Sequence, residues 1–146
     1  MYTTKQLTSA IAVLDNWQFF RKGLTLCGNT NYEQMLKVFC YLAGTNRGFV
    51  AIVGDDIQPI GFGVMENVTP IFTSHGQFLC RAFYHKGGNL SATLCLMEFF
   101  EKWAREQQVD SYSVTTERQS GAAIRCFKSE KYGFKRSFVQ FVKQLN

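Results

Sequence analysis

The residues best suited to chemistry in this chain form a basic, glycine-containing turn near its middle, Lys86-Gly87-Gly88-Asn89-Leu90-Ser91. The turn follows an extended stretch, residues 76–84, and leads into an amphipathic stretch, residues 90–108, that predicts a helix. Glycines let the backbone approach an anion closely, and the first N–H groups of a helix have no partner within it. The segment therefore predicts a phosphate-binding turn, although Gly-Gly also occurs in ordinary strand-to-helix connections.

Basic side chains gather in the same part of the sequence as this turn. The chain has 16 Lys and Arg, 11 Asp and Glu, and a formal net charge of +5. Residues 1–80 contain five basic and five acidic side chains, so the whole excess lies in residues 81–146, with five basic residues in 125–136. Such a group attracts anions such as a phosphorylated cofactor, a nucleic acid or an acidic protein, or it forms an ordinary solvated helix face.

Cysteines and histidines form no recognisable catalytic or metal-binding pattern. The five cysteines are widely spaced, include no C-x-x-C pair, and mostly have apolar neighbours. This pattern indicates buried thiols, and it predicts neither a disulfide framework nor a zinc site. The two histidines, His75 and His85, sit in no ligand or triad pattern, so we expect no metal site and no Ser-His-Asp triad.

Length and composition predict a single domain covering residues 1–146. The chain is 46% hydrophobic and 15% aromatic, has two prolines, and contains no linker-like stretch. No apolar run approaches the roughly 18–20 residues that a membrane helix needs, and the first residues lack a signal-peptide pattern. These features indicate a soluble cytoplasmic protein that makes no contact with a membrane.

A long helix is predicted for residues 3–22. Its apolar residues fall at three- and four-residue spacing: Leu7, Ala10, Ile11, Leu14 and Trp17. A capping box of Thr3 with Gln6 would begin this helix, and Gly23 would end it. No strand is expected ahead of it.

A second helix and a hairpin are predicted next. Residues 31–43 have an apolar helical face, preceded by a capping signature of Thr30 with Glu33. The apolar run 48–54 and the returning stretch 59–68 predict two strands joined by a turn.

The second half of the sequence predicts alternating strands and helices. Strands are expected at 76–84, 111–117 and 134–145, and helices at 90–108 and 120–131. The first strand, the long helix and the next strand should form a parallel crossover. Ligands of such sheets tend to bind at the carboxyl ends of the strands, which is where the glycine turn lies.

Three segments in a fixed order connect the chain to a known family. The first is the hairpin with the strand 76–84, and the second is the turn that opens the helix containing Glu101-Lys102-Trp103-Ala104. The third is Ser120-Gly121-Ala122-Ala123-Ile124-Arg125-Cys126-Phe127, followed by Tyr132-Gly133-Phe134. In order and spacing these segments resemble the GNAT-type N-acetyltransferases, and most of all small divergent members found in bacteriophage genomes. From about residue 49 onward, the resemblance implies a GNAT-like α/β fold, with a mostly antiparallel mixed sheet, flanking helices and one parallel strand–helix–strand crossover.

The resemblance implies acetyl-CoA as the co-substrate, with its pyrophosphate bound by backbone N–H groups of the glycine turn. The family signature, Arg/Gln-x-x-Gly-x-Gly/Ala, fits this turn in two registers. One register aligns Lys86 with the basic position and Asn89 and Ser91 with the glycines. The other uses Gly87 and Gly88 for close approach and treats Asn89 as an insertion, and we favour it because glycine has no side chain to obstruct a phosphate.

Further contacts to acetyl-CoA follow from the same resemblance. The splayed end of the preceding strand would pair with pantetheine, and a backbone N–H there would also stabilise an oxyanion. Lys86 and either Arg125 or Lys128 would face the phosphates. The implied cofactor-binding residues are Arg81, Ala82, Phe83, Tyr84, Lys86, Gly87, Gly88, Asn89, Leu90, Ser91, Ser120, Arg125 and Phe127.

The family reaction is direct transfer, in which an amine attacks the thioester and a base accepts its proton. The resemblance makes Glu66 the base. His75, His85 and Glu117 are alternatives on the grounds of pKa or position, and each is also an ordinary surface residue.

An acid must then protonate the departing thiolate. In the family this acid is a tyrosine of the last helix, and the matching position here is Phe127, which has no proton to donate. Tyr132, Tyr84 or water would take that role, while Ser120 replaces the usual asparagine of the same helix.

Two other functions stay open at this point. One is a GNAT-fold viral protein without catalysis, acting as a virion component or a host-protein-binding module, and Phe127 and Asn89 favour it. The other is nucleic-acid binding through the basic C-terminal part, against which stands the absence of a recognition motif. The expected partners are acetyl-CoA and an unidentified amine or protein, with the chain a monomer or a homodimer.

Overall fold

The computed structural model describes residues 1–26, 31–68, 77–85, 89–109, 111–114, 125, 127–134, 141, 143 and 145. The chain divides into two compact units, Met1–Thr115 and Thr116–Asn146. The elements of the first unit are β1 (Thr3–Leu7), α1 (Ala10–Asp15), α2 (Trp17–Leu26), α3 (Tyr32–Gly44), β2 (Gly48–Gly54), β3 (Pro59–Val68), β4 (Gln77–His85), α4 (Leu90–Glu106) and β5 (Ser111–Ser113).

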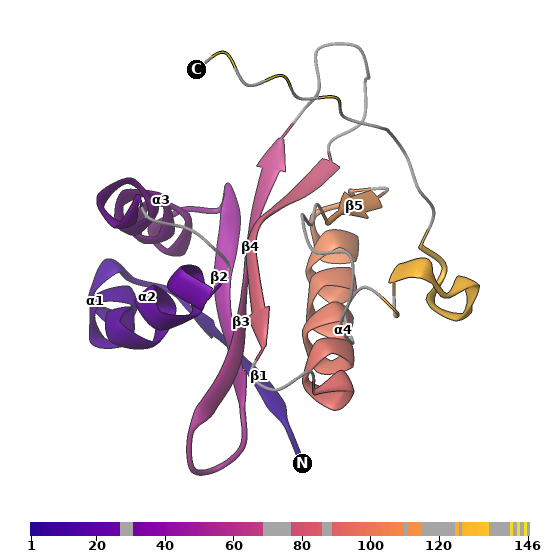
Figure 1. Cartoon of the computed structure of the whole chain (residues 1–146), viewed down its shortest axis with the longest axis horizontal. Helices are drawn as coiled ribbons and strands as arrows, with labels where there is room; N and C mark the ends of the chain where they lie inside the picture. The colour runs from indigo at the N-terminus through magenta and orange to yellow at the C-terminus, as the bar shows by residue number, and fades with distance from the viewer. Residues whose placement is uncertain are drawn as a thin grey trace. The chain divides into compact units, whose positions relative to one another are not determined.

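The five strands form one sheet in the order β1-β2-β3-β4-β5 (Figure 1). The first three pairings are antiparallel, and β4 pairs with β5 in parallel. A parallel pair needs a crossover, and α4 supplies it. The predicted strand–helix–strand crossover and the predicted hairpin of β2 with β3 are therefore both confirmed.

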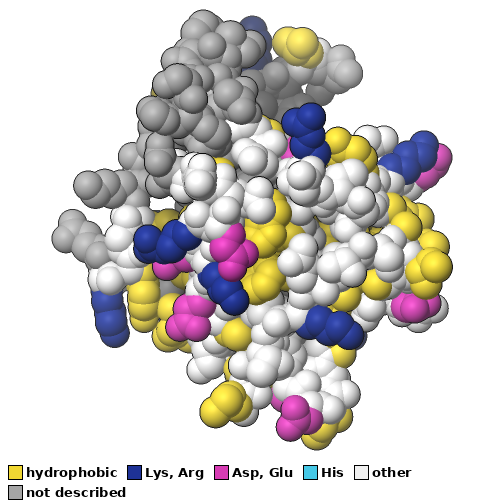
Figure 2. Space-filling model, turned by 180° about the vertical axis from the view of Figure 1, so that it is seen from behind, with side chains coloured by type: hydrophobic (Ala, Val, Ile, Leu, Met, Phe, Trp, Pro, Cys, Tyr) yellow, Lys and Arg dark blue, Asp and Glu magenta, His cyan; other side chains and the backbone are white. Residues whose placement is uncertain are grey.

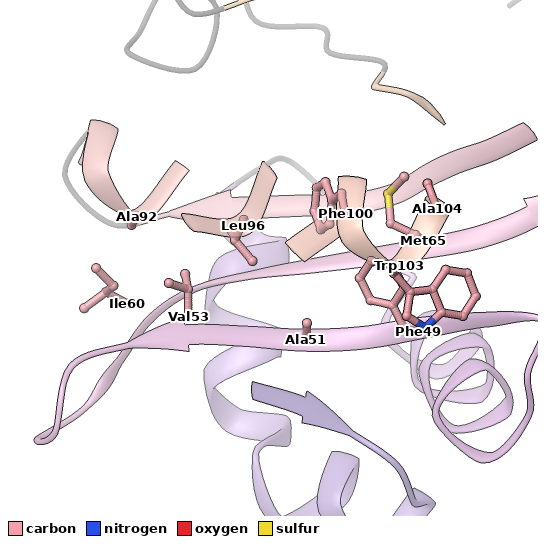
Figure 3. Close-up of a cluster of buried hydrophobic side chains, with 10 residues drawn as sticks. All are labelled: Phe49, Ala51, Val53, Ile60, Met65, Ala92, Leu96, Phe100, Trp103 and Ala104. Carbon is pink, nitrogen blue, oxygen red and sulfur yellow. The ribbon is translucent and has the colours of Figure 1, made fainter. Parts of the chain in front are cut away.

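Helices cover both faces of the sheet in the first unit (Figure 1). Helices α1, α2 and α3 lie on one face, over a buried cluster that includes Phe20, Phe39 and Phe62. Helix α4 lies on the other face, where Phe49, Leu96 and Phe100 are fully buried (Figure 3). The amphipathic helix predicted for residues 90–108 is confirmed as α4, whose buried residues include Leu96, Met97, Phe100, Trp103 and Ala104.

The predicted helix 3–22 is wrong at its start. Residues Thr3–Leu7 form an edge strand that pairs with β2, so Thr3 and Gln6 cap no helix. Ser9 caps α1 instead, its hydroxyl accepting from the Ala12 N–H at 3.1 Å. The prediction failed because Leu7 is buried as a strand residue yet falls at helical spacing from the apolar residues that follow.

The apolar face assigned to that helix is also wrong. Ile11 and Leu14 are 71% and 54% exposed, whereas Val13 is fully buried. The helix ends at Asn16, whose side chain donates to the Ala12 carbonyl at 2.8 Å, and α2 begins at Trp17. Gly23 lies inside α2 and does not end it.

The remaining boundaries follow the predictions more closely. Strands β2 and β3 span the predicted residues, and the Asp55 carboxylate accepts from the N–H groups of Ile57 and Gln58 in the turn between them. These hydrogen bonds hold the pKa of Asp55 below its ordinary value. Helix α3 is capped by Asn31, which accepts from the Gln34 N–H at 3.3 Å, so the cap predicted at Thr30 is wrong.

The C-terminal predictions are only partly covered by the described residues. Strand β5 spans Ser111–Ser113, and Val114 is already outside it. In the second unit residues 125, 127 and 128 are helical, a short 3₁₀ turn covers Glu130–Tyr132, and Gly133 follows with φ of 79°. The described residues of the predicted last strand, at 134, 141, 143 and 145, belong to no strand.

Glycines bring the helices of both layers close to β3. A Cβ at Gly23 of α2 would lie 2.5 Å from the Phe62 ring and 2.7 Å from the Tyr84 ring. On the other face a Cβ at Gly63 would overlap the Phe100 ring. Phe62 and Phe100 are fully buried, so neither ring has room to move aside.

We expect Gly23→Ala to destabilise the protein by about 1–3 kcal/mol, because the added methyl overpacks the α2–sheet contact. Gly44→Ala is the matched control, since a Cβ at this glycine of α3 meets nothing within 4 Å. It should leave stability unchanged or raise it by up to about 1 kcal/mol through helix propensity. Urea unfolding of both variants measures the difference, and equal stabilities would contradict the packing argument.

Candidate functional site

Strand β4 has one edge that is paired only in part. On the β5 side the described ladder consists of Gln77, Phe78 and Leu79 with Ser111, Tyr112 and Ser113. From Cys80 to His85 the strand continues without a described partner on that side, because β5 has ended by Val114. Five steps of about 3.3 Å make this open edge about 17 Å long, with main-chain N–H and C=O groups directed outward at every second residue. It can therefore accept an extended ligand that carries amide groups.

A bulge falls at the beginning of this open edge. Val64 of β3 pairs with Ala82 and the next residue, Met65, pairs with Cys80, so Arg81 has no opposite residue in the ladder. Bulges bend a strand and redirect its backbone groups, and they are frequent beside active sites. The backbone of residues 81–84, predicted to bind pantetheine, thus begins at an irregularity in β4.

Glu66 lies beside the point where β4 and β5 part. It pairs in register with Leu79, the last residue of β4 in the β5 ladder. Its side chain is half-buried, and by alternation along β3 it shares a sheet face with Phe62 and Val64. The carboxylate predicted to act as the base therefore lies on β3, opposite the last β4 residue of the described β4–β5 ladder.

Tyr84 lies at the other end of the same edge. Its ring packs against Phe19 of α2 and Phe62 of β3, with centroid distances of 6.3 and 5.7 Å. It pairs in register with Phe62, four residues from Glu66, which corresponds to about 13 Å along the strand. The structure thus does not bring the two predicted catalytic residues Glu66 and Tyr84 together.

The N-terminus of α4 follows the C-terminal end of β4 (Figure 1). Asn89 is its cap, with Oδ1 accepting from the Ala92 N–H at 3.2 Å and its carbonyl accepting from the Thr93 N–H at 3.1 Å. Among the described residues, the N–H groups of Leu90 and Ser91 have no hydrogen-bond partner. Two main-chain donors at the positive end of a 17-residue helix can thus meet an anion.

The side chain of Asn89 makes a second contact that the sequence did not predict. Its Nδ2 donates to the hydroxyl of Tyr2 at 2.6 Å, just ahead of β1. Nearby, the Thr4 hydroxyl donates to the Cys95 carbonyl at 3.3 Å, and the Cys95 thiol donates to the Tyr2 carbonyl at 3.6 Å. The N-terminal strand therefore fixes the first two turns of α4, and no local sequence pattern reports such a long-range contact.

Several predicted site residues lie outside the described residues. These are Lys86, Gly87, Gly88, Ser120, His75 and Glu117. For Arg81, Ala82, Phe83 and His85 the structure describes the strand backbone alone.

The other predicted residues lie in the second unit. Phe127 packs edge-on against Phe134, with ring centroids 4.9 Å apart, and Arg125 is exposed. Tyr132 is half-buried, and the Lys131 ammonium lies 5.5 Å from the centre of its ring. Phe127 is therefore used in packing, while Tyr132 keeps a phenol beside a positive charge.

Other kinds of site find little support in the described part of the chain. Burial raises the pKa of the Cys40 thiol, which makes it a poor nucleophile at neutral pH. No group of three or more His, Cys, Asp or Glu that could hold a metal occurs among the described residues. None of their helices combines the length and apolar character that crossing a bilayer requires. On the face seen in Figure 2, basic and acidic side chains are interspersed.

Comparison with known proteins gives a clear result at the level of structure alone. No family model matches the sequence, and no curated protein is significantly similar to it. Among solved structures, a GNAT family acetyltransferase from Staphylococcus aureus subsp. aureus USA300_TCH1516 is similar over 99% of this chain and 98% of its own, with a TM-score of 0.69 and 14% identity. The AAC(6')-Iy protein in complex with the bisubstrate analogue CoA-S-monomethyl-acetylneamine is similar over 99% and 98%, with a TM-score of 0.72 and 14% identity.

These similarities show that the chain has the GNAT fold, as predicted. A protein described as a transcriptional regulator from Bacillus halodurans C-125 also matches, over 99% of this chain and 100% of its own, with a TM-score of 0.74 and 11% identity. One fold can carry several functions, so the activity must be argued from the site.

Proposed function

We propose that this protein is an N-acetyltransferase that moves an acetyl group from acetyl-CoA to an amine. The observation that carries the proposal is that the described β4–β5 ladder ends after three residue pairs, in a sheet that has the GNAT fold. Several proteins with this fold are acetyltransferases, and one is bound to a coenzyme A analogue.

The open edge of β4 and the start of α4 fit two parts of acetyl-CoA. Pantetheine is an extended chain with two amides, which suits main-chain pairing along Cys80–His85. The diphosphate is anionic, which suits the N–H groups of Leu90 and Ser91 at the helix N-terminus. Because the helix begins just beyond the strand, one ligand can reach both features.

The chemistry then begins where the open edge begins. A neutral amine attacks the thioester carbonyl, and the Glu66 carboxylate accepts the proton that the nitrogen loses. A backbone N–H at the Arg81 bulge stabilises the oxyanion of the tetrahedral intermediate. The intermediate collapses with cleavage of the C–S bond, and the thiolate takes a proton from water.

A second candidate function is a GNAT-fold protein without catalysis, which binds another protein in a viral or host setting. Two observations favour it. Phe127 occupies the position of the expected acid and packs against Phe134. Asn89 has a side chain where a phosphate-binding turn normally has glycine, and its Oδ1 already occupies the Ala92 N–H.

Acetyl-CoA binding separates these two functions. We expect acetyl-CoA at about 100 times its Kd to stabilise the folded protein by about 2.7 kcal/mol, seen as a rise in Tm. We also expect coenzyme A release, detected with a thiol reagent, in the presence of one or more amines from a panel of aminoglycosides, polyamines and lysine peptides. Binding without turnover would support the second function, and absence of binding would contradict the first.

The diphosphate contact is tested by deleting one main-chain donor with Leu90→Pro. Proline is well tolerated at the first position of a helix, and Asn89 already has the extended conformation, φ −75° and ψ 102°, that precedes proline. Loss of a hydrogen bond to a charged group should raise the Kd for acetyl-CoA about tenfold or more. Isothermal titration calorimetry measures this, with Leu90→Ala as the control that keeps the N–H. Equal affinities of the two variants would place the diphosphate elsewhere.

The base is tested by Glu66→Gln, which keeps the size of the side chain and removes its proton-accepting charge. We expect kcat to fall about 100- to 1,000-fold while the Kd for acetyl-CoA stays the same. Glu98→Gln, at an exposed position of α4, is the control and should behave as wild type. If the Glu66→Gln variant stays active, Glu66 is not the base, and His75, His85, Glu117 or water accepts the proton.

A further inference from the structure

Asn89 departs from the glycine-rich pattern of a phosphate-binding turn, and its contacts explain how the turn can still bind an anion. An N-cap side chain accepts from the N–H of either the second or the third helical residue. In α4 these are Ser91 and Ala92, and Asn89 Oδ1 accepts from Ala92. The choice matters, because a bond to Ser91 would consume one of the two donors that the diphosphate needs.

The opposite end of the Asn89 carboxamide is held by Tyr2. Nδ2 donates to the Tyr2 hydroxyl at 2.6 Å while Oδ1 accepts from Ala92 at 3.2 Å, so the planar group is fixed at both ends. Rotation of the side chain toward Ser91 would break the bond to Tyr2.

Tyr2 is itself fixed in place by the packing around it. Its ring lies against the buried cluster between the sheet and α4, and its carbonyl accepts from the Cys95 thiol at 3.6 Å. Two residues further on, the Thr4 hydroxyl donates to the carbonyl of the same Cys95. The hydroxyl of Tyr2 thus sits at a defined distance from the start of α4.

We infer that Tyr2 is a positioning residue for the cofactor site: it holds the Asn89 cap on Ala92 and so keeps the N–H groups of Leu90 and Ser91 available to the diphosphate. This role rests on the proposed function. It means that Tyr2, a residue outside the turn, contributes to the affinity for acetyl-CoA. Tyr2 acts through Asn89 and takes no part in proton transfer.

Tyr2→Phe removes the hydroxyl and keeps the ring that packs on the core. We expect the Kd and the KM for acetyl-CoA to rise about 3- to 10-fold, the effect of one neutral hydrogen bond, with kcat unchanged. The Kd for acetyl-pantetheine, which has no diphosphate, should not change. Tyr41→Phe is the control, since Tyr41 is 53% exposed on α3, and it should bind both ligands as wild type does.

Asn89→Ser is the second variant, because serine can still cap the helix but has no amide to donate to Tyr2. Its loss of acetyl-CoA affinity should match that of Tyr2→Phe, and the double variant should lose no more than either single one. Three results would overturn the role of Tyr2 and leave the proposed function standing. These are additive losses in the double variant, a wild-type affinity in Tyr2→Phe, and an equal loss of affinity for acetyl-pantetheine. A wild-type protein that binds no acetyl-CoA would overturn the proposed function and this role with it.

Discussion

Main-chain hydrogen bonding along β4 is asymmetric, and the arrangement of the first unit follows from this asymmetry. One edge of the strand is paired with β3 from Gln77 to His85, with a single interruption at Arg81. The other edge is paired with β5 for three residues, and from Cys80 to His85 it has no partner among the described residues. A parallel partner demands a crossover, and the crossover helix must begin at the carboxyl end of β4. The open edge and the positive end of α4 are therefore neighbours because of the topology, before any side chain is considered.

The central strands could be predicted from sequence because their composition leaves little choice. The run from Gly48 to Gly54 is almost wholly apolar and bounded by glycines, and its returning partner contains the uncharged run 59–65. The N-terminal strand could not be predicted in the same way. Four of its five residues, Thr-Thr-Lys-Gln, are polar, so its strand character comes from pairing with β2 and not from any pattern of its own.

The candidate site, too, could be predicted from the sequence only in part. The order of strand, glycine turn and helix was sufficient to indicate an anion-binding corner, because each part has a local signal. The placement of Glu66 beside the end of the β4–β5 ladder depends on strand register and on a bulge, which a linear pattern does not encode. The contact between Tyr2 and Asn89 joins residues 87 positions apart, so no local pattern could have indicated it.

The close approach of Gly63 to Phe100 has a consequence for how this sequence can change over time. The glycine and the aromatic ring share one volume between β3 and α4, and a Cβ at position 63 would come within 2.6 Å of a second ring carbon. Position 63 therefore cannot gain a side chain while position 100 keeps a phenylalanine. In diverging descendants of this chain, a methyl or larger group at position 63 should be accompanied by a smaller side chain at position 100, so the two sites are expected to coevolve as a pair.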